Sequence, residues 1–493
     1  MLLNSSSGKF PVYTIEQVRE LDRIAIQEQG ISGYLLMQRA ATAVFASMRE
    51  CYPQARSLCI VCGAGNNAGD GYVLARLAQQ AGWQVQVLAV SSPVSLQQDA
   101  QTAYQDYLKQ GGEVTEFTGS LPLTDLIVDA LFGTGLTRPL QGVWKIAIKA
   151  INACSQPVVA IDLPSGLNGN TGQALGSAVN ANLTVTFIGL KQGLLTGQAR
   201  AYVGELALAD LDLPESVLKR VPTQNYTLAR DFLKICLPKR ARCAHKGQFG
   251  HVLLIGGQAG MAGAIRLAGE AALRTGSGRV SLGTDPKHAA WLNLNRPELM
   301  VDAIQAHEVA NSLKQKTVVG LGPGLGTTAL ALAIWSATLT TQLPLVLDAD
   351  ALNLLAQAPE QRSNWILTPH PAEAARLLAC TTEEVEQDRF AAVRTLQQKY
   401  GGVIVLKGAG SLVADEAAIA VCLAGNPGMA TAGMGDVLTG IVTSLVGQGL
   451  SLMEAASAGV LIHALAADQA AEQGERGLLA TDVIEQLRKW VNP

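Results

Sequence analysis

The sequence lacks the features of a membrane protein and of a nucleic-acid-binding protein. No apolar run reaches the roughly 18 uninterrupted residues that a membrane-spanning helix needs. No long basic run is present, and the formal net charge is −3, so neither a membrane nor a nucleic acid is expected as a partner. The N-terminal stretch MLLNSSSGKFPVYT lacks the charged region and the long apolar region of a signal peptide. The predicted location is therefore cytoplasmic.

Charged residues are also few, at 16% of 493 residues, whereas hydrophobic residues make up 48%. This balance excludes a disordered chain and is typical of well-buried globular domains. At roughly 150 residues per domain, the length accommodates about two to four domains. Glycine is abundant, with 50 residues, which predicts tight turns and places where the backbone approaches a ligand closely.

The eight cysteines show no metal-binding or disulfide pattern. Cys59 and Cys62 form a CxxC pair, but the pair lies inside the apolar run SLCIVCGAG, and no second pair stands at zinc-ligand spacing. We favour core packing over metal or redox chemistry, because free cysteine is commonly buried. Scattered cysteines are typical of a reducing compartment.

Strand-like and helix-like segments alternate through the first half of the chain. A helix is predicted over 14–30, where Thr14 and Gln17 have the spacing of a capping box. Strands are predicted over 57–65, 83–90, 125–133, 157–166 and 182–189, and helices over 69–82, 94–111 and 142–154. This alternation predicts a parallel sheet covered by helices.

The pattern weakens over 211–230, LDLPESVLKRVPTQNYTLAR, where proline and polar residues interrupt it. We place a domain boundary near 225, which gives domains over 1–225 and 226–493. A second α/β series follows, with strand-like segments at 251–257, 317–326, 344–353 and 402–410 and a helix over 262–278. The sequence therefore predicts two α/β domains, each with its own core.

Residues 425–440, GNPGMATAGMGDVLTG, place Asp436 where a glycine-rich loop runs into an apolar stretch. Glycines allow close backbone approach, and a helix N-terminus offers free N–H groups to an anion, so this loop suits a phosphate. A carboxylate there would repel a bare phosphate, which indicates a base or a metal ligand. The structural alternative is a helix cap.

Other polar residues follow strand-like runs of the second half, where ligands collect in parallel α/β folds. They are Lys407 and Ser411 in VLKGAGS, His370 in LTPHPAEAARLL, Asp348, Asp350 and Asn353 in DADALN, and the glycines of GLGPGLG (320–326). A lysine beside backbone amides can hold a phosphate. The ordinary alternatives are a solvated lysine, a turn histidine packed by prolines and a simple glycine turn.

GMATAGMGDVLTG resembles the glycine-rich anion loop and catalytic aspartate of the ribokinase-like superfamily. With TPHPAE and KGAGS also present, the second half resembles the ADP-dependent NAD(P)H-hydrate dehydratases. The resemblance implies that Asp436 takes a hydroxyl proton from the substrate while loop amides hold the phosphoryl group in transfer. It also implies ADP as co-substrate and Mg²⁺ to neutralise the nucleotide phosphates. The amides concerned are those of Ala432, Gly433, Met434 and Gly435.

The same resemblance implies the remaining contacts of this half. The nucleotide is expected to bind Lys407, Gly408, Ala409, Gly410, Ser411 and Gly435. The hydrated nicotinamide nucleotide is expected to contact Ala264 in GMAGAIRLAG, Gly324, Gly326, His370 and Asp436. KGAGS does not separate ADP from ATP, and no motif separates NADHX from NADPHX.

Three polar turns follow strand-like runs of the first half. They are GNNAGDGYVLARLA (65–78), VDALFGTGLTRPL (128–140) and AIDLPSGLNGNTG (160–172). The first differs from GxGxxG and from the P-loop pattern, yet its side chains offer donors and acceptors near a helix N-terminus, suited to a diphosphate and a cation. One such turn could be purely structural, but three predict a common crevice.

Together these turns resemble those of the NAD(P)H-hydrate epimerases, whose usual loop is NNGGDG. Ala68 replaces one glycine, and its methyl group would limit how closely a diphosphate lies over the turn. The resemblance implies that Asp162 is the substrate contact best placed to move a proton, and that Asn67, Asp129 and Ser165 hold K⁺. Lys191, in IGLKQGLL, is a further candidate, with a surface lysine as the alternative. The implied substrate contacts are Asn66, Asn67, Ala68, Gly69, Asp70, Gly133, Thr134, Gly135, Leu136, Thr137, Arg138, Pro139 and Asp162.

The resemblance covers about residues 10–222 and 230–490. It implies an N-terminal Rossmann-like three-layer α/β/α domain followed by a ribokinase-like α/β domain. The implied function is repair of hydrated nicotinamide cofactors: the first half epimerises R- and S-NAD(P)HX, and the second half dehydrates S-NAD(P)HX with ADP, giving NAD(P)H, AMP and phosphate. Two alternatives stay open: the second half could be a kinase that releases a stable phosphorylated molecule, or the first half a non-catalytic nucleotide-binding scaffold. We also expect a homo-oligomer, of a size that the sequence does not define.

Overall fold

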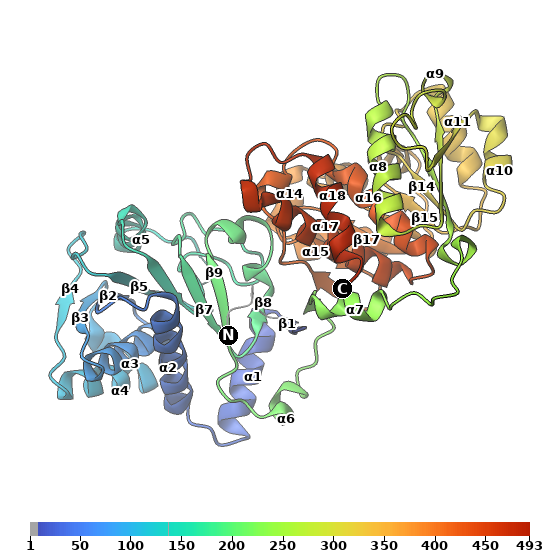
Figure 1. The fold of residues 1–493 in the computed structure, drawn as a ribbon. Helices are drawn as coiled ribbons and strands as arrows, with labels where there is room; N and C mark the ends of the chain where they lie inside the picture. Colours follow the sequence, from blue (N-terminus) through green and yellow to red (C-terminus); the bar gives the residue numbers. More distant parts are fainter. Residues whose placement is uncertain (1–7, 137) are drawn as a thin grey trace. The chain divides into compact units, whose positions relative to one another are not determined.

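The computed structural model describes residues 8–136 and 138–493, so the expected contact Thr137 lies outside the described residues. The chain divides into two compact units. Residues 10–225 form the N-terminal unit, and residues 8–9 with 226–493 form the C-terminal unit. Each unit has its own sheet and its own hydrophobic core (Figure 1).

A seven-stranded sheet, parallel throughout, forms the centre of the N-terminal unit, in the order β4-β3-β2-β5-β6-β7-β9. The chain moves outward one way from β2 and the other way from β5, so the switch point of the topology lies between them. The strands are β2 (Ser57–Cys62), β3 (Gln84–Ala89), β4 (Val114–Glu116), β5 (Leu126–Ala130), β6 (Val158–Ile161), β7 (Leu183–Phe187) and β9 (Glu205–Ala209). A separate two-stranded parallel sheet pairs β1 (Val12–Tyr13) with β8 (Leu190–Lys191).

Helices cover both faces of this sheet, so the predicted three-layer α/β/α arrangement is confirmed (Figure 1). Leu58, Ile60 and Cys62 of β2 join the core under α1 to α4, whereas Cys59 and Val61 join the core under α5. The CxxC cysteines therefore face opposite sides of the sheet, because side chains alternate along a strand. Both are buried and free, as the core-packing interpretation predicts. The helices are α1 (Ile15–Gln27), α2 (Gly33–Cys51), α3 (Asn66–Gln80), α4 (Gln98–Lys109), α5 (Val143–Ala153) and the short α6 (Glu215–Leu218).

Two helix starts decide where the site residues of this unit lie. The capping box of α1 is confirmed: Thr14 Oγ1 accepts from Gln17 N at 3.2 Å, and Gln17 Oε1 accepts from Thr14 N at 2.9 Å. Helix α3 begins at Asn66, three residues before the predicted start at 69. The stretch predicted as a polar turn is therefore the first turn of a helix, which fixes the direction of its side chains.

A ten-stranded sheet forms the centre of the C-terminal unit, in the order β10-β19-β18-β17-β16-β15-β14-β11-β12-β13. Only the β17–β18 and β18–β19 pairs are antiparallel, and the switch point lies between β11 and β14. The strands are β10 (Tyr226–Thr227), β11 (His251–Ile255), β12 (Arg279–Thr284), β13 (Leu299–Ala303), β14 (Val318–Leu321), β15 (Leu345–Leu347), β16 (Trp365–Leu367), β17 (Val403–Leu406), β18 (Leu412–Ala414) and β19 (Ile419–Val421).

Four helices, α8, α16, α17 and α18, share the main core of this unit with one face of the sheet. At the closest approach, a Cβ on Gly440 of α16 would lie 2.1 Å from the Ala268 carbonyl oxygen of α8, so only glycine fits there. On the opposite face, Trp365 Nε1 donates to the Tyr400 carbonyl of α15 at 3.0 Å. The helices are α7 (Asp231–Cys236), α8 (Ala262–Thr275), α9 (Pro286–Ala289), α10 (Val309–Ser312), α11 (Ala329–Thr338), α12 (Asp350–Gln357), α13 (Pro371–Leu378), α14 (Thr382–Gln387), α15 (Arg389–Tyr400), α16 (Met434–Gly447), α17 (Leu452–Ala470) and α18 (Ala480–Trp490).

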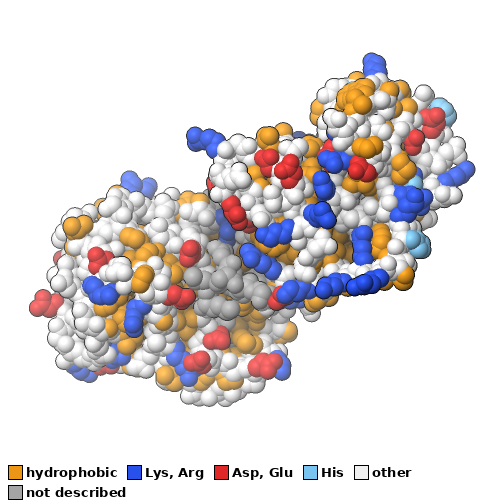
Figure 2. All heavy atoms as spheres, viewed as in Figure 1, with side chains coloured by type: hydrophobic (Ala, Val, Ile, Leu, Met, Phe, Trp, Pro, Cys, Tyr) orange, Lys and Arg blue, Asp and Glu red, His pale blue; other side chains and the backbone are white. Residues whose placement is uncertain are grey.

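Within the described residues, none of these helices combines the length and the apolar character needed to cross a bilayer. On the face of the molecule seen in Figure 2, hydrophobic and charged side chains are interspersed over both units.

Candidate active sites

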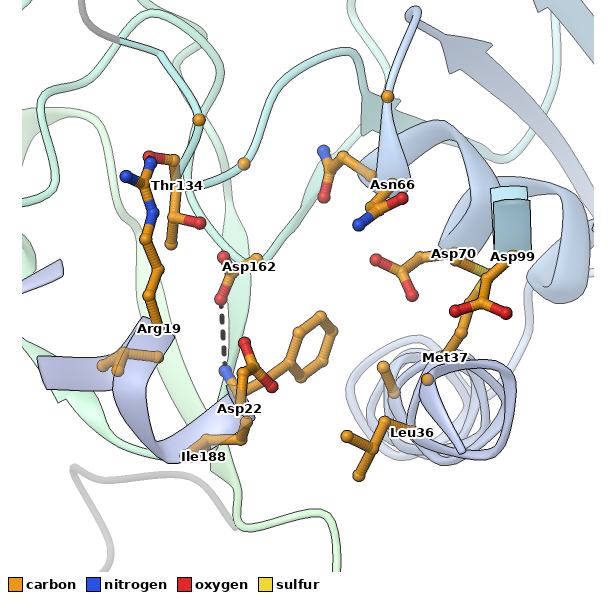
Figure 3. A pocket seen from close by; sticks show the side chains of 18 of the residues that line it. Arg19, Asp22, Leu36, Met37, Asn66, Asp70, Asp99, Thr134, Asp162 and Ile188 are labelled. Atoms are coloured by element: carbon orange, nitrogen blue, oxygen red, sulfur yellow. Dashed lines mark hydrogen bonds between the residues drawn. The ribbon is translucent and has the colours of Figure 1, made fainter. Parts of the chain in front are cut away.

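A cavity of about 650 Å³ opens at the switch point of the N-terminal sheet. The segments that follow β2 and β5 form part of its wall, as expected for a parallel α/β sheet. Helices α1 and α2 and the segment around β8 complete it (Figure 3). Residues from all three predicted polar turns contribute, among them Asn66, Thr134 and Asp162.

A buried ion pair stands in the wall of this cavity. Lys191 Nζ donates to Asp162 Oδ1 at 2.5 Å, the bond drawn as a dashed line in Figure 3. It also donates to Thr186 Oγ1 at 2.9 Å and to the Phe187 carbonyl at 2.8 Å. The Lys191 side chain is 1% exposed, so the alternative of a surface lysine is wrong. Asp162 has φ +67°, a left-handed conformation that costs a non-glycine residue about 1–3 kcal/mol. The ion pair therefore fixes the carboxylate of Asp162, a residue with a strained backbone, at the end of β6.

Three more carboxylates line the cavity: Asp22 on α1, Asp70 on α3 and Asp99 on α4 (Figure 3). Burial raises the pKa of Asp22 to about 6, although Lys191 opposes the shift. Burial also raises the pKa of Asp70 well above its usual range, and Asp162 and Asp22 add to the shift. The cavity can thus hold carboxyl groups in both protonation states near neutral pH.

Another part of the cavity wall suits an anion. The N-cap of α3 is Gly65, which supplies no capping side chain, so the amides of Asn66 and Asn67 are available to a ligand, while Ala68 N donates to the Gly65 carbonyl. Gly133, Thr134 and Gly135 line the same region, and Arg19 reaches it by donating to the Thr134 carbonyl at 2.7 Å. A diphosphate would fit here.

The structure brings only part of the predicted substrate-binding set to the cavity. Asn66, Asn67, Asp70, Gly133, Thr134, Gly135 and Asp162 line it. Ala68 is fully buried in the core, and Gly69 packs where a Cβ would lie 2.5 Å from Met37 Cε. Leu136, Arg138 and Pro139 are not among the lining residues. The expected limit set by the Ala68 methyl on the diphosphate is therefore wrong, because the helical start of α3 turns this methyl inward.

Asp129 and Ser165 lie together behind the cavity wall. Ser165 donates to Asp129 through Oγ at 2.6 Å and through its amide at 2.7 Å. Asp129 is fully buried, and burial raises its pKa to about 6. Among the described residues, no Lys, Arg or His forms an ion pair with it, while the buried Asn67 amide nitrogen has no hydrogen-bond partner. These oxygen donors and the unbalanced buried charge fit a monovalent cation.

In the C-terminal unit, five neighbouring strands, β11, β14, β15, β16 and β17, deliver the predicted residues to one edge of the sheet. Asp348 follows β15, His370 follows β16 and Lys407 follows β17. A Cβ on Gly435 of α16 would lie 3.4 Å from Lys407 Nζ and 3.5 Å from Asp348 Oδ2. The N-terminus of α16 therefore lies next to the residues that follow β15 and β17.

Lys407 is the centre of a buried charge network. Its Nζ donates to Asp348 Oδ1 at 2.7 Å and lies 3.7 Å from Glu373 Oε2. Thr439 Oγ1 donates to the other Asp348 oxygen at 2.7 Å. Burial lowers the pKa of Lys407, but Asp348 and Glu373 outweigh burial and the net shift is upward. Lys407 is thus a fixed cation beside the glycine loop, with a side chain that is only 18% exposed, and the solvated-lysine alternative is wrong.

Asp436 is the third residue of α16, and the N-cap is Gly433 with φ +90°. The helix-cap alternative is therefore wrong, because no side chain caps this helix. Burial and the nearby Asp348 raise the pKa of Asp436 to about 7, although Lys407 opposes the shift. A carboxylate with this pKa, next to free helix amides, is suited to accept a proton near neutral pH.

His370 caps α13, because its Nδ1 accepts from Ala372 N at 3.1 Å. Nε2 then carries the proton of the neutral ring; it lies 3.4 Å from Glu373 Oε1, on a side chain that is half-exposed and can also reach a ligand. Burial and Lys407 lower the pKa of His370, which keeps the ring neutral. The structural and the binding interpretations of this histidine are therefore compatible.

The segment after β14 contains two further residues predicted to contact the substrate, Gly324 and Gly326. Gly324 has φ +59°, and a Cβ there would lie 3.3 Å from Ala264 Cβ. Gly326 has φ +73°, and its amide donates to Asp350 Oδ2 at 2.7 Å. Both glycines thus occupy left-handed turns beside the start of α8, in which Ala264 is the third residue.

Arg389, at the start of α15, binds the backbone at the beginning of the KGAGS segment. Its Nη2 donates to the carbonyls of Lys407 at 3.0 Å and Leu406 at 3.3 Å. A Cβ on Gly408 would lie 2.9 Å from the same nitrogen, which explains the glycine. Ser411 Oγ donates back to the Gly408 carbonyl at 2.9 Å. The segment from Gly408 to Ser411, with Ala409 and Gly410 between them, is therefore a tight turn at the end of β17.

Sequence reasoning missed Asp22, Glu373, Arg19 and Arg389. For Asp22 a signal existed: it lies four residues after Val18 and three before Ala25, both on the buried stripe of α1. An acidic residue on an apolar stripe is uncommon and deserves a functional explanation. Arg389 carried no such signal, because its role depends on carbonyl groups that are 17 and 18 residues away.

Two protein-family models match this chain, one in each unit. A family model described as NAD(P)H-hydrate dehydratase matches residues 252–489, and one described as YjeF-related protein N-terminus matches residues 33–193. The chain is 49% identical to the bifunctional NAD(P)H-hydrate repair enzyme Nnr of Coxiella burnetii, over 98% of this chain and 99% of that protein. It is 44% identical to the enzyme of the same name from Escherichia coli, over 100% and 96%.

A solved structure is similar to the C-terminal unit. It is the ADP/ATP-dependent NAD(P)H-hydrate dehydratase from Bacillus subtilis, co-crystallised with ATP and Mg²⁺, which is 27% identical with a TM-score of 0.50. The match covers 54% of this chain and 96% of that one. The ribokinase-like fold predicted for the C-terminal unit is confirmed, since a second similar structure, from Enterococcus faecalis, is described as a ribokinase-like superfamily protein (31% identity, TM-score 0.51, 54% of this chain and 95% of that one).

Proposed function

Because the chain belongs to the family of bifunctional NAD(P)H-hydrate repair enzymes, we propose that its two units catalyse successive repair steps. The N-terminal unit interconverts R- and S-NAD(P)HX, and the C-terminal unit dehydrates the S form with ADP, giving NAD(P)H, AMP and phosphate. The observation that carries the proposal is that each unit has its own site at the carboxyl ends of its parallel strands, with a carboxylate near the N-terminus of a helix that no side chain caps.

In the C-terminal unit, Asp436 accepts the proton of the C6 hydroxyl as the β-phosphoryl group of ADP is transferred to that oxygen. The amides from Ala432 to Gly435 and the fixed ammonium of Lys407 stabilise the charge of the phosphoryl group. The C6–O bond then breaks with help from the ring nitrogen lone pair, phosphate leaves, and loss of a proton from C5 completes the dihydronicotinamide ring. Gly324, Gly326, Ala264 and His370 contact the nicotinamide nucleotide.

The residues present fit a Mg²⁺ ion held mainly by the nucleotide. In the described part of the chain no three His, Cys, Asp or Glu side chains are arranged to hold a metal alone, and Mg²⁺ commonly takes one or two carboxylates together with substrate phosphates and water. Asp348 and Asp350 are the carboxylates that would hold it, and when bound it neutralises phosphate charge. The segment from Gly408 to Ser411 and Gly435 would bind the nucleotide around it.

In the N-terminal unit, the diphosphate of NAD(P)HX binds at the start of α3 and at Gly133–Gly135, which places the hydrated ring near Asp162. A K⁺ ion held by Asn67, Asp129 and Ser165 would compensate the buried charge of Asp129 and support the wall of the cavity. Asp162, fixed by Lys191, is the anionic group closest to the reacting ring.

The rate of the dehydration step should depend on pH through Asp436. A base acts only when it is ionised, and the pKa of Asp436 lies at about 7. We therefore expect kcat/KM for S-NADHX to fall about tenfold per pH unit below this value and to level off above it. Steady-state rates between pH 5.5 and 8.5 measure this, and a profile that stays flat through pH 6 would contradict the base role.

The test of the proposed function is conversion of a mixture of S- and R-NADHX, with ADP and Mg²⁺, followed through the near-ultraviolet absorbance of NADH. Recovery of NADH beyond the S fraction, faster than uncatalysed epimerisation, supports both steps. Recovery that stops at the S fraction contradicts the epimerase assignment. Accumulation of a stable phosphorylated product without NADH would show that the C-terminal unit is a kinase, and binding without epimer exchange would show that the N-terminal unit is a scaffold.

We also propose a cytoplasmic homo-oligomer. All eight cysteines are free, which suits a reducing compartment. Large apolar side chains are exposed on both units, among them Leu123 at 89%, Ile235 at 76% and Leu294 at 61%, and a subunit contact would bury such groups. Sedimentation equilibrium should give a mass that is a multiple of 51.6 kDa, and a monomer at micromolar concentration would contradict this.

A further inference from the structure

Two carboxyl groups enter the N-terminal cavity from different helices and have no protein partner. Asp22 comes from α1, on the side of Asp162, and Asp70 comes from α3 (Figure 3). Both point into the cavity in this view. No hydrogen bond or ion pair joins either side chain to another residue in the ranges 8–136 and 138–493. They are free to exchange protons with a ligand between them.

Asp162, which also lines the cavity, is in a different state. Its Oδ1 accepts from Lys191 Nζ, from Thr186 Oγ1 at 3.3 Å and from Phe187 N at 3.3 Å. Three donors therefore hold this carboxylate oxygen in place, whereas Asp22 and Asp70 have no such donors. Asp22 adds to the rise in the pKa of Asp70, and Asp162 adds to the rise in the pKa of Asp22. The cavity therefore presents two carboxyl groups from separate helices, neither held by a protein partner and both with a raised pKa.

We propose that Asp22 and Asp70 are the two catalytic acid–base groups of epimerisation, each acting on one face of the hydrated ring. This inference rests on the proposed function of the N-terminal unit. An epimerase must treat both configurations at C6, and a ring held between two walls presents its hydroxyl to one wall as the R form and to the other as the S form. A single carboxyl could serve only one of them.

The reaction proceeds by exchange of water at C6. The protonated carboxyl on one wall gives its proton to the C6 hydroxyl, the C6–O bond breaks, and water leaves. The lone pair of the ring nitrogen forms a C=N bond, so the ring carries one positive charge. A water on the other wall then adds to C6, and the ionised carboxyl there takes its proton. The enzyme finishes with the proton on the opposite carboxyl, and solvent exchange restores the starting state.

The charges of the cavity favour this route over ring opening. The cationic ring lies beside the fixed Asp162 anion and one ionised carboxyl, which stabilise it in a partly buried site. Ring opening by cleavage of the C6–N bond would give a neutral aldehyde, for which this arrangement of carboxylates offers no comparable stabilisation. The aromatic side chain of Phe187 and the apolar Ile188 and Met37 line the space for the ring.

The experiment follows oxygen exchange in ¹⁸O-labelled water with the full chain, starting from pure S- or pure R-NADHX without ADP. Mass spectrometry and chromatography give label uptake at C6 and epimer interconversion, each corrected for the uncatalysed rate. The wild-type chain should show both. Asp22→Asn and Asp70→Asn should each lower epimerisation by at least about a hundredfold, yet each should keep label uptake with one epimer, and a different epimer in each case.

The retained uptake shows that each variant is folded, and the double variant should lose it with both epimers. Glu20→Gln is the matched control: it makes the same change on α1, at a side chain 44% exposed and paired with Arg23, and should behave as wild type. The inference is overturned if wild type epimerises without label uptake, if either single variant epimerises within about tenfold of wild type, or if both variants keep exchange with the same epimer. Absence of any epimerisation by wild type would instead remove the proposed function of this unit.

Discussion

Asp436→Asn is expected to lower kcat of the dehydration step by at least about a hundredfold, the low end of the effect of a catalytic acid or base. Asparagine keeps the size and polarity of the side chain but cannot accept a proton. The carboxylate lies in a site where burial and Asp348 disfavour its charge, so its retention there indicates a chemical role rather than a stabilising one. The rate of NADH formation from S-NADHX with saturating ADP and Mg²⁺ measures the effect.

Stability should move in the opposite direction to activity. A pKa raised in the folded state means that the ionised carboxylate is less stable there than in the unfolded chain. Above pH 7, Asp436→Asn should therefore leave the C-terminal unit at least as stable as wild type. Asp415→Asn, in the turn between β18 and β19 where Asp415 accepts from Ala417 and Ala418 amides, is the matched control and should keep full activity. A variant at Asp436 that retains more than a tenth of wild-type turnover would contradict the base role.

Lys191→Met is expected to destabilise the N-terminal unit by about 3–5 kcal/mol, because it leaves the Asp162 carboxylate buried without its partner. Two further acceptors, Thr186 Oγ1 and the Phe187 carbonyl, lose the same donor. For a unit of this size, such a loss corresponds to a decrease of roughly 6–20 °C in its unfolding temperature. Epimerisation should fall with it, because Asp162 loses the group that holds its position.

Calorimetry of the full chain can show which unit is destabilised. ADP with Mg²⁺ raises the unfolding temperature only of the unit that binds it, so the transition that does not shift belongs to the N-terminal unit. The double variant Lys191→Met with Asp162→Asn should recover most of the lost stability, because no unpaired charge then remains. Lys149→Met, at an exposed position of α5, is the surface control. If Lys191→Met shifts the transition no more than Lys149→Met does, the pair does not stabilise the unit.

Local patterns in the sequence were sufficient to predict the two α/β domains and the neighbourhood of both sites. Strands β2, β5, β6, β11 and β17 fall within predicted segments because buried parallel strands are continuous apolar runs bounded by glycine turns. Polar residues at the ends of those runs, such as Asp348 and Asp162, lie at the carboxyl edge of a sheet. Parallel pairing brings these edges together whatever the details of packing, so Asp436, His370 and Lys407 could be placed in one site.

The direction of individual side chains could not be predicted in the same way. Ala68 is buried and Asn67 lines the cavity, although both belong to one polar motif, because α3 begins at Asn66 and a helix turns successive side chains by about 100°.

What the sequence by itself determined is the order of the elements, the two folds and the chemistry gathered at each strand edge, because propensity, periodicity and turn residues act over a few neighbouring positions. Only the tertiary structure decided that Asp22 on α1 faces Asp70 on α3, that Lys191 is buried against Asp162, and that Arg389 supports the KGAGS segment. Each of these arrangements involves residues that are 17 or more positions apart in the chain. Such contacts follow from the packing of helices onto a sheet and from burial of charge, which no local pattern records.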